Sequence, residues 1–305
     1  MRSPTLLDLP PPPDSVTVWP WTRGSPALPE VMPDGRDWPL ISIVTPSFNQ
    51  GRYLEQALRS VLLQGYPRLE LIVIDGGSTD GTIELIKKYE PWLKHWVSQP
   101  DGGPADALNK GFRYASGEIL GFLNADDFYL AGCFARVARE FSADPAIDVV
   151  SGHGYFAKAS GELGMATFSD AWNPRRFRYG ACVLVQPATF FRRAAFARAG
   201  GFRRSGSLCW DMELWADMAR IGAKFRAIDA FMAVFRLHGG SITASSEHRR
   251  RRRADAEAVR LAGRAPSIPD RLLHYLYRIV KFSVHPGRTL RQRAFFVSTL
   301  KRWSL

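Results

Sequence analysis

The chain has 305 residues, and 46% of them are hydrophobic, which is enough to bury the core of one large domain or of a domain with an appendage. Its three cysteines form no CxxC pair, which argues against a disulfide framework or a zinc site and favours a reducing compartment. The formal net charge of +12 lies entirely in residues 249–305, which hold 15 basic and 3 acidic residues (15 − 3 = 12).

The first residues, "MRSPTLLDLPPPPDS", lack the apolar core of a signal peptide, and no apolar run approaches the roughly 18 residues of a transmembrane helix. These absences predict a cytoplasmic protein that is soluble or lies against the inner face of the cell membrane. Prolines recur in residues 1–37 and cluster at 10–13, which predicts an extended Pro-rich arm without a core of its own.

Strand and helix patterns alternate from residue 40 to about residue 130. Strands are predicted at 40–47, 69–74, 95–100 and 118–127, and helices at 53–65, after the glycine turn at 76–77, and at 105–117. This β-α-β-α-β-α-β order predicts a parallel sheet covered by helices. Beyond it the pattern is less regular, with candidate strands at 148–157, 182–193 and 224–235 and a helix at 211–222.

Polar side chains gather where the predicted strands end. Ser47, Asp75 and the pair Asp126 and Asp127 follow the first, second and fourth strands, at the edge where open α/β sheets bind ligands. Neither GxGxxG after the first strand nor GxxxxGK[ST] is present, so a dehydrogenase or a P-loop NTPase is not expected. Carboxylates at this edge suit a protein that holds a diphosphate through a divalent cation. In the plainer alternative, "NADD" is a turn or a helix cap.

Four segments, in order, resemble those of family 2 glycosyltransferases with the GT-A fold: "TPSFNQGRYLEQALRSVLLQ", "ELIVIDGGSTDGT", "DGGPADALNKGFRYASGEILGFLNADD" and "WDMELWADMARIG". The resemblance covers about residues 38–245. It implies a Rossmann-like, mixed and mostly parallel sheet flanked by helices, with a nucleotide-binding half at 38–130 and an acceptor half at 131–245. The arm at 1–37 precedes this domain, and a basic helical extension at 246–305 follows it.

The resemblance also implies a reaction. Such enzymes transfer a sugar, with inversion, from a nucleotide diphosphate sugar to an acceptor hydroxyl, normally with Mn²⁺ or Mg²⁺. We expect a role in bacterial-type polysaccharide or glycolipid synthesis, with a saccharide or a lipid-linked acceptor.

Donor contacts are implied for residues throughout the first half of the domain: Thr45, Pro46, Asn49, Glu55, Asp75, Asp101, Lys110, Asn124 and Asp126. Asp75 matches the aspartate that contacts the base or the ribose. Glu55 falls near an acid that contacts the base, but it could equally lie on a solvated helix face. Asp101 and Lys110 could approach the ribose or a phosphate, or could be exposed charges.

The metal is expected at the family's DxD region, which Asp126 and Asp127 resemble. Asn124 stands where many members have Asp, so which carboxylate is the principal ligand stays open. We favour Asp127 as the metal ligand, with Asp126 contacting the ribose and supporting the metal. His238, in "FRLHGGSIT", resembles a late histidine that is a further metal ligand, although a lone histidine is more often structural.

Inverting transfer needs a base that takes the proton of the acceptor hydroxyl. Asp211, in "CWDMELW", matches the family's catalytic acid residue, and Trp210 beside it is a candidate sugar platform. A helix cap is the plainer role of Asp211, and Glu213 is the competing base. A further segment resembles the border of the acceptor cleft, through Gln186, Pro187, Thr189, Arg192 and Arg193.

The basic tail lies outside the resemblance. The run Arg249–Arg253 would be repulsive unless it is exposed or faces anions. Further on, an apolar stripe (Leu272, Tyr275, Leu276, Ile279 and Val280) lies beside basic residues (Arg271, Arg278 and Lys281). Such a helix can lie on an anionic membrane surface, or can pack on the domain with a solvated basic face. No nucleic-acid-binding motif is present, so no nucleic acid is expected as a partner.

Two other functions compete with the glycosyltransferase. A sugar-nucleotide nucleotidyltransferase would carry a glycine- and basic-rich loop after the first strand, where this chain has "TPSFNQG". A catalytically inactive basic protein that binds membranes or nucleic acid on the same scaffold would not be expected to retain all of the candidate site residues.

Overall fold

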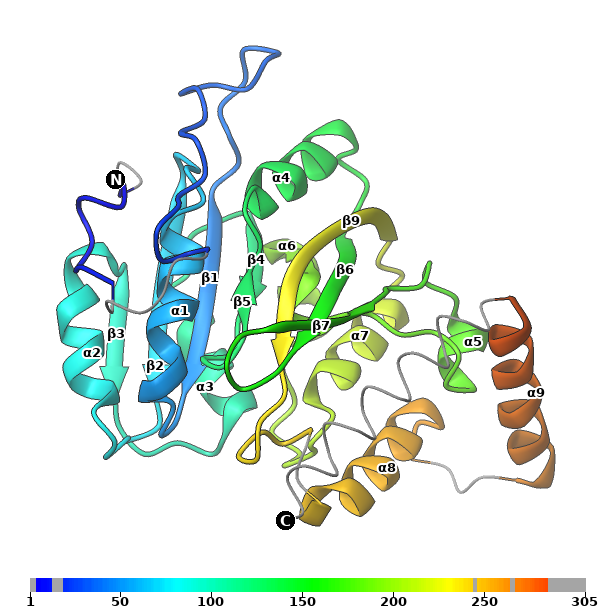
Figure 1. Ribbon diagram of the computed structural model, residues 1–305. Helices are drawn as coiled ribbons and strands as arrows, with labels where there is room; N and C mark the ends of the chain where they lie inside the picture. The colour runs from blue at the N-terminus through cyan, green and yellow to red at the C-terminus, as the bar shows by residue number, and fades with distance from the viewer. Residues whose placement is uncertain (1–3, 13–18, 244–245, 264–266, 285–305) are drawn as a thin grey trace.

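The computed structural model describes residues 4–12, 19–243, 246–263 and 267–284. Within them, nine strands form one sheet in the order β3-β2-β1-β4-β8-β6-β9-β5, with β7 paired to β6 (Figure 1). The mixed α/β architecture agrees with the predicted fold class, and helices cover both faces of the sheet.

The first half follows the predicted alternation. Strands β1 (Ile41–Ser47), β2 (Leu69–Asp75), β3 (His95–Ser98) and β4 (Ile119–Phe122) are parallel to one another. Between them lie α1 (Gly51–Leu62), α2 (Thr82–Tyr89), the 3₁₀ turn η1 (Glu90–Trp92) and α3 (Pro104–Phe112). All seven residues of β1 are buried, as expected for a central parallel strand covered on both faces.

The second half adds antiparallel pairs and is less regular. Its elements are β5 (Phe128–Tyr129), α4 (Cys133–Ala143), β6 (Val149–Ala157), β7 (Leu163–Thr167), α5 (Pro174–Arg178), η2 (Gln186–Ala188), β8 (Thr189–Arg192), α6 (Arg193–Ala199), α7 (Trp210–Arg220) and β9 (Phe225–Arg236). Strand β8 is antiparallel to β4 and β6, and β9 is parallel to β6. The predicted strand at 182–193 is thus only four residues long, because Pro187 cannot donate a backbone hydrogen bond and the chain forms the turn η2 there.

Two apolar layers sandwich the sheet. One contains side chains of α1, α2 and α4, such as Leu58, Tyr89 and Phe134. The other contains side chains of α3 and α7, such as Phe112 and Trp215. These layers hold the parallel strands in register, so that their carboxyl ends meet at one edge.

The N-terminal arm lies against the first of these layers. Leu9 and Met32 are buried within it, and Trp19 Nε1 donates a hydrogen bond to the carbonyl of Tyr129 at 2.8 Å. The fully buried Arg59 of α1 donates to the carbonyl of Pro10 at 2.8 Å and to the hydroxyl of Tyr89 at 3.1 Å. A buried charged residue in the last turn of α1 thereby binds the arm to the domain.

Two helices follow the sheet, α8 (Ser246–Arg260) and α9 (Ile268–Val284), and they lie on the side of α5 and α7 (Figure 1). None of the described helices is both long enough and apolar enough to cross a bilayer.

Candidate functional site

A cleft of about 780 Å³ opens where β1, β2 and β4 end. Its walls come from the loop after β1, the glycines after β2, the start of α3, the loop after β4, the start of α7 and the segment after β9. Several side chains singled out from the sequence line it: Pro46, Ser47, Asp101, Asn124, Asp126, Gln186, Trp210 and Asp211. The sheet therefore brings together residues that lie up to 165 positions apart in the chain (211 − 46).

The end of β1 presents buried hydroxyl groups to this cleft. Ser47 lines it, and the hydroxyls of Thr45 and Ser47 make no hydrogen bond with the described residues. Since buried polar groups are nearly always hydrogen-bonded, the unpaired hydroxyl of Ser47, which lines the cleft, favours a polar ligand there. Thr45 itself is fully buried and does not line the cleft.

Asn49 joins the loops that follow β1 and β2. Its backbone N–H donates to the hydroxyl of Ser78 at 2.7 Å, and its side-chain oxygen accepts from the N–H of Thr79 at 2.9 Å. Its φ of 51° lies in the left-handed region, which asparagine tolerates better than most residues. Asn49 does not line the cleft, and its described contacts position the two loops that do.

Asp75, at the last position of β2, is fully buried. Its carboxylate accepts hydrogen bonds from the N–H groups of Gly77 (3.1 Å) and Ser78 (2.8 Å) and from the hydroxyl of Ser98 (2.6 Å). Gly77 has a φ of 86°, which favours glycine. Asp75 thus holds the glycine loop that forms the cleft wall, and its contact with a base or a ribose stays a prediction.

The remaining donor candidates differ in position. Asp101 lines the cleft, where burial raises the pKa of its carboxyl group although the N–H of Gly103 and the charge of Lys110 oppose the shift. Lys110 pairs with Asp106 within α3 at 3.1 Å. Glu55 accepts a hydrogen bond from the hydroxyl of Tyr89 at 2.8 Å, between α1 and α2, and does not line the cleft.

The loop after β4 separates the two neighbouring aspartates. Asp126 lines the cleft, and its Oδ2 lies 2.9 Å from Nε2 of His238. Asp127 is buried, and its Oδ1 accepts the backbone N–H of Arg236 at 2.9 Å. Burial, reinforced by the charge of Asp126, raises the pKa of Asp127 well above the usual range of aspartate. This geometry favours Asp126 over Asp127 as the carboxylate that meets a ligand.

Arg236 holds the loop after β4 in place, a role that the sequence pattern did not predict. Its guanidinium donates to the carbonyl of Asp126 at 2.7 Å and to Gln56 Oε1 at 2.6 Å, and it lies over the rings of Tyr53 and Phe128. The signal available in the sequence was an arginine two residues before His238, at the end of an apolar strand. Its role depends on pairing between β9 and β5, which lie about 100 residues apart.

A metal ion would find two protein ligands here. No group of three or more His, Cys, Asp and Glu residues suited to a metal occurs in the described part of the chain. Asp126 Oδ2 and His238 Nε2 form a hydrogen bond of 2.9 Å with each other, so both atoms are close enough together to bind one cation in place of that bond. Carboxylate and imidazole are both suitable donors for Mn²⁺. The pair therefore fits a cation whose other ligands are phosphate oxygens and water.

The start of α7 forms the opposite wall. Asp211 lines the cleft, and burial raises the pKa of its carboxyl group, against the N–H of Met212 and the charge of Arg252. Glu213, two residues further along the helix, points elsewhere, because both of its oxygens accept hydrogen bonds from the hydroxyl of Ser205, at 2.9 and 3.0 Å. Trp210 lines the cleft and packs on Phe122 with a centroid distance of 5.2 Å.

Of the segment expected at the border of the acceptor cleft, mainly one residue reaches the cleft. Gln186 lines the cleft and accepts a hydrogen bond from Nδ2 of Asn124 at 3.0 Å. Thr189 and Arg192 point into the protein, where their side chains bond to the carbonyls of Val185 and Ile147.

Helix α8 also reaches the cleft. Arg252 lines it. Two neighbouring residues of α8 bind the loop that precedes Asp211. Asp255 accepts a hydrogen bond from the N–H of Leu208 at 2.8 Å, and Arg251 donates one to the carbonyl of Gly206 at 2.5 Å. The sequence predicted this helix as part of a separate basic extension, with no link to the site. The run of five arginines was the available signal, but its direction depends on how the helix packs.

Known proteins resemble this chain in sequence and in fold. An uncharacterized glycosyltransferase of Mycobacterium tuberculosis is 33% identical over 177 residues, which are 57% of this chain and 67% of that protein. Chondroitin synthase of Pasteurella multocida is 27% identical over 207 residues, which are 66% of this chain but 21% of the synthase.

Among solved structures, a mannosyltransferase from Pyrobaculum calidifontis in complex with GDP-Man and Mn²⁺ superposes with a TM-score of 0.55 and 21% identity, covering 86% of each chain. This likeness shows the GT-A fold. A model of glycosyl transferase family 2 matches residues 42–200, which are more than half of the chain and hold β1 to α6. The chain therefore belongs to glycosyltransferase family 2 and is a glycosyltransferase.

Proposed function

We propose that the protein transfers a sugar, with inversion and with a divalent cation, from a nucleotide diphosphate sugar to an acceptor hydroxyl. The observation that carries this proposal is that Asp126 and Asp211 line one cleft from opposite halves of the domain. The donor diphosphate would lie beside Asp126 and the acceptor hydroxyl beside Asp211, with the sugar between them.

Asp126 and His238 would hold the cation, Mn²⁺ or Mg²⁺, together with diphosphate oxygens. When bound, the cation would neutralise the charge that develops on the leaving diphosphate. Asp127 would not bind the cation itself. Its carboxyl group would hold the loop that carries Asp126 in position, because it accepts the N–H of Arg236. The mannosyltransferase of similar fold, in complex with GDP-Man and Mn²⁺, supports such a donor and such an ion.

Asp211 would take the proton of the acceptor hydroxyl. A base works best when its pKa is close to the working pH, and burial raises the pKa of Asp211 in that direction. Glu213 is less suitable, because Ser205 binds its carboxylate away from the cleft. Trp210 would offer an apolar surface to the acceptor or the transferred sugar.

The acceptor would be a saccharide or a lipid-linked molecule used in polysaccharide or glycolipid synthesis. The name of one relative, chondroitin synthase, supports such a role.

Contact with an anionic membrane surface would come from α9, whose apolar stripe is exposed. Ile268, Leu272, Tyr275, Leu276, Ile279 and Val280 are between 48% and 76% exposed. The packed face of the same helix touches the domain through the stacked rings of Tyr277 and Tyr179. An exposed apolar stripe on a basic helix supports membrane contact better than complete packing on the domain.

The decisive test is incubation of the full chain with a panel of nucleotide sugars and Mn²⁺, followed by identification of the released nucleotide. Release of a nucleoside diphosphate from one donor, abolished by a chelator and by Asp126→Asn, is the expected result. Release of pyrophosphate from a nucleoside triphosphate and a sugar phosphate would instead indicate a nucleotidyltransferase. Nucleotide binding without turnover of any donor would support the inactive scaffold.

A further inference from the structure

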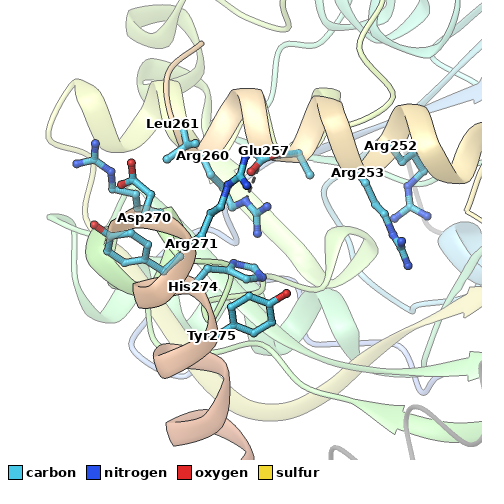
Figure 2. A pocket seen from close by; sticks show the side chains of 12 residues that line it. Arg252, Arg253, Glu257, Arg260, Leu261, Asp270, Arg271, His274 and Tyr275 are labelled. Atoms are coloured by element: carbon cyan, nitrogen blue, oxygen red, sulfur yellow. Dashed lines mark hydrogen bonds between the residues drawn. The ribbon is translucent and has the colours of Figure 1, made fainter. Parts of the chain in front are cut away.

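A second cavity, of about 750 Å³, lies between α5, α8 and α9 (Figure 2). Five arginines line it: Arg178 from α5, Arg252, Arg253 and Arg260 from α8, and Arg271 from α9. We call this cavity the arginine pocket. On α8 its lining residues follow helical spacing, at positions 252, 253, 256, 257 and 260, so one face of the helix borders it.

The positive charge of the arginine pocket is only partly balanced. Two carboxylates line it, those of Glu257 and Asp270, so its net charge is +3 with His274 neutral (5 − 2). Asp270 is largely engaged at the start of its own helix, where it accepts hydrogen bonds from the N–H and the hydroxyl of Ser267 at 3.0 and 2.5 Å. Like charges that line one cavity repel each other unless anions face them.

Three of the arginines are available to a ligand. The side chains of Arg178, Arg253 and Arg271 are exposed, and their guanidinium groups form no hydrogen bond or ion pair with the described residues. Other residues hold the walls in position. Arg251 and Asp255 attach α8 to the loop before α7, and an ion pair between Lys281 and Asp170 attaches α9 to the domain. The pocket is thus formed without using these three side chains for its own assembly.

The arginine pocket adjoins the cleft between Asp126 and Asp211. Arg252 lines both cavities, and its Nη1 donates to the carbonyl of Thr243, which also lines the cleft. A molecule bound in the pocket could therefore extend past Arg252 toward Asp211, on the side of the cleft that belongs to the acceptor.

We infer that the arginine pocket binds a phosphate or diphosphate group of the acceptor, so that the acceptor substrate is phosphorylated. This inference rests on the proposed function. Guanidinium groups bind phosphate oxygens through two parallel hydrogen bonds, and several of them around one cavity favour a compact group with more than one negative charge. Tyr275, one residue of the exposed apolar stripe of α9, also lines the pocket. A lipid attached to such a phosphate would have an apolar surface next to its binding site.

The test compares two matched pairs of substitutions in the full chain. Arg178→Ala with Arg253→Ala removes one pocket arginine from α5 and one from α8. Arg175→Ala with Arg250→Ala removes one exposed arginine from the same two helices outside the pocket, and leaves the same net charge. Binding of inorganic pyrophosphate is measured by calorimetry in the presence of EDTA, so that no cation can bridge the probe to Asp126.

The wild type and the Arg175/Arg250 variant should bind pyrophosphate with similar affinity, and the Arg178/Arg253 variant should bind it at least about ten-fold more weakly, because hydrogen bonds between charged groups are lost. Binding should also weaken as salt is added. Absence of pyrophosphate binding by the wild type, or equal weakening in both variants, would overturn the inference. Arg271→Ala, on the third helix, repeats the comparison if the first variant loses thermal stability.

Two further arms identify the source of the phosphate. Flotation is measured with phosphatidylcholine vesicles that contain either a polyprenyl phosphate or phosphatidylglycerol. A preference for the polyprenyl phosphate that pyrophosphate abolishes would indicate a lipid-linked acceptor, and pyrophosphate binding without that preference would indicate a soluble phosphorylated acceptor. An oligonucleotide that binds equally to the wild type and the Arg178/Arg253 variant, and displaces pyrophosphate from both, would contradict the inference.

Donor turnover separates this inference from the proposed function. A wild type that releases nucleoside diphosphate but does not bind pyrophosphate refutes the inference alone. A wild type that binds pyrophosphate in the pocket but turns over no nucleotide sugar refutes the proposed transfer reaction and leaves an anion-binding protein.

Discussion

Replacement of Asp211 by Asn should abolish most of the sugar transfer and leave donor binding nearly unchanged. The carboxylate lines the cleft at the first turn of α7, far along the chain from the donor-side residues after β1, β2 and β4. Asparagine keeps the shape and the position at the helix start and removes the ability to accept a proton. A positioned general base contributes about 10²–10⁴-fold to the rate. The expected loss of kcat therefore corresponds to about 2.7–5.4 kcal/mol of transition-state stabilisation.

The pH dependence gives a second measure of the same group. A base must be ionised to act, so activity should fall as the pH drops through the pKa of Asp211 in the folded protein. Because burial raises that pKa, the acid limb of kcat/KM should have a midpoint above about 3.9, the ordinary value for aspartate. The raised pKa also means that folding disfavours the ionised form. Above that pKa, Asp211→Asn should therefore leave the free energy of unfolding unchanged or increase it.

The assay is release of nucleoside diphosphate in the presence and absence of acceptor, with nucleotide affinity measured by calorimetry. Glu213→Gln is the matched control, because its carboxylate is bound by Ser205 and does not line the cleft. A large loss in Glu213→Gln with normal turnover in Asp211→Asn would move the base to Glu213. Normal transfer by both variants would refute the assignment of the base to this helix.

Three other expectations follow from the described contacts. Asp126→Asn should remove Mn²⁺-dependent donor binding, whereas Asp127→Asn should retain more of it, because the buried amide oxygen can still accept the N–H of Arg236. Calorimetry with and without Mn²⁺ measures both affinities, and a larger loss in Asp127→Asn than in Asp126→Asn would restore Asp127 as the main ligand. Arg236→Ala should lower the free energy of unfolding in urea by about 3–5 kcal/mol, because the carbonyls of Asp126 and Ala159 and the amide oxygen of Gln56 lose their donor, at about 1–3 kcal/mol for each buried acceptor left unpaired. Arg226→Ala, which removes an ion-paired and more exposed arginine of the same strand, should cost under about 1 kcal/mol. Substituting Ser for both Leu272 and Ile279 should reduce flotation with anionic vesicles while thermal stability stays unchanged, since both side chains are mostly exposed; unchanged flotation at low salt would exclude α9 as the membrane contact.

Much of the nucleotide-binding half could be predicted because its determinants are local. The helix that starts after β1 repeats its apolar residues at helical spacing, and the strands β1, β2 and β4 are short apolar runs that end in glycine, proline or polar residues. Parallel strands must then be connected by helices, so their carboxyl ends share one edge. That rule alone places Pro46, Asp101 and Asp126 in one region, as the cleft confirms.

The direction of each side chain at that edge depended on distant parts of the chain. Asp126 and Asp127 are neighbours with the same chemistry, but they face different partners. The end of β9 brings the N–H of Arg236 to Asp127, and the segment after it brings His238 to Asp126. Arg59 is buried in α1 because the N-terminal arm supplies the carbonyl groups of Pro10 and Trp21 to its guanidinium, and no pattern within the helix indicates this. Arg252 belongs to the cleft only because Asp255 docks α8 beside α7.

The sequence by itself determined the order of strands and helices, the edge of the sheet at which the cleft opens, and the family. Each of these rests on patterns within a few consecutive turns or on motifs that keep their order. The tertiary structure decided which carboxylate faces the cleft, which one stays inside, and how the basic helices surround a second cavity. These outcomes depend on hydrogen bonds and packing between residues that are 45 to 180 positions apart, and no local pattern encodes which of several similar side chains will find such a partner.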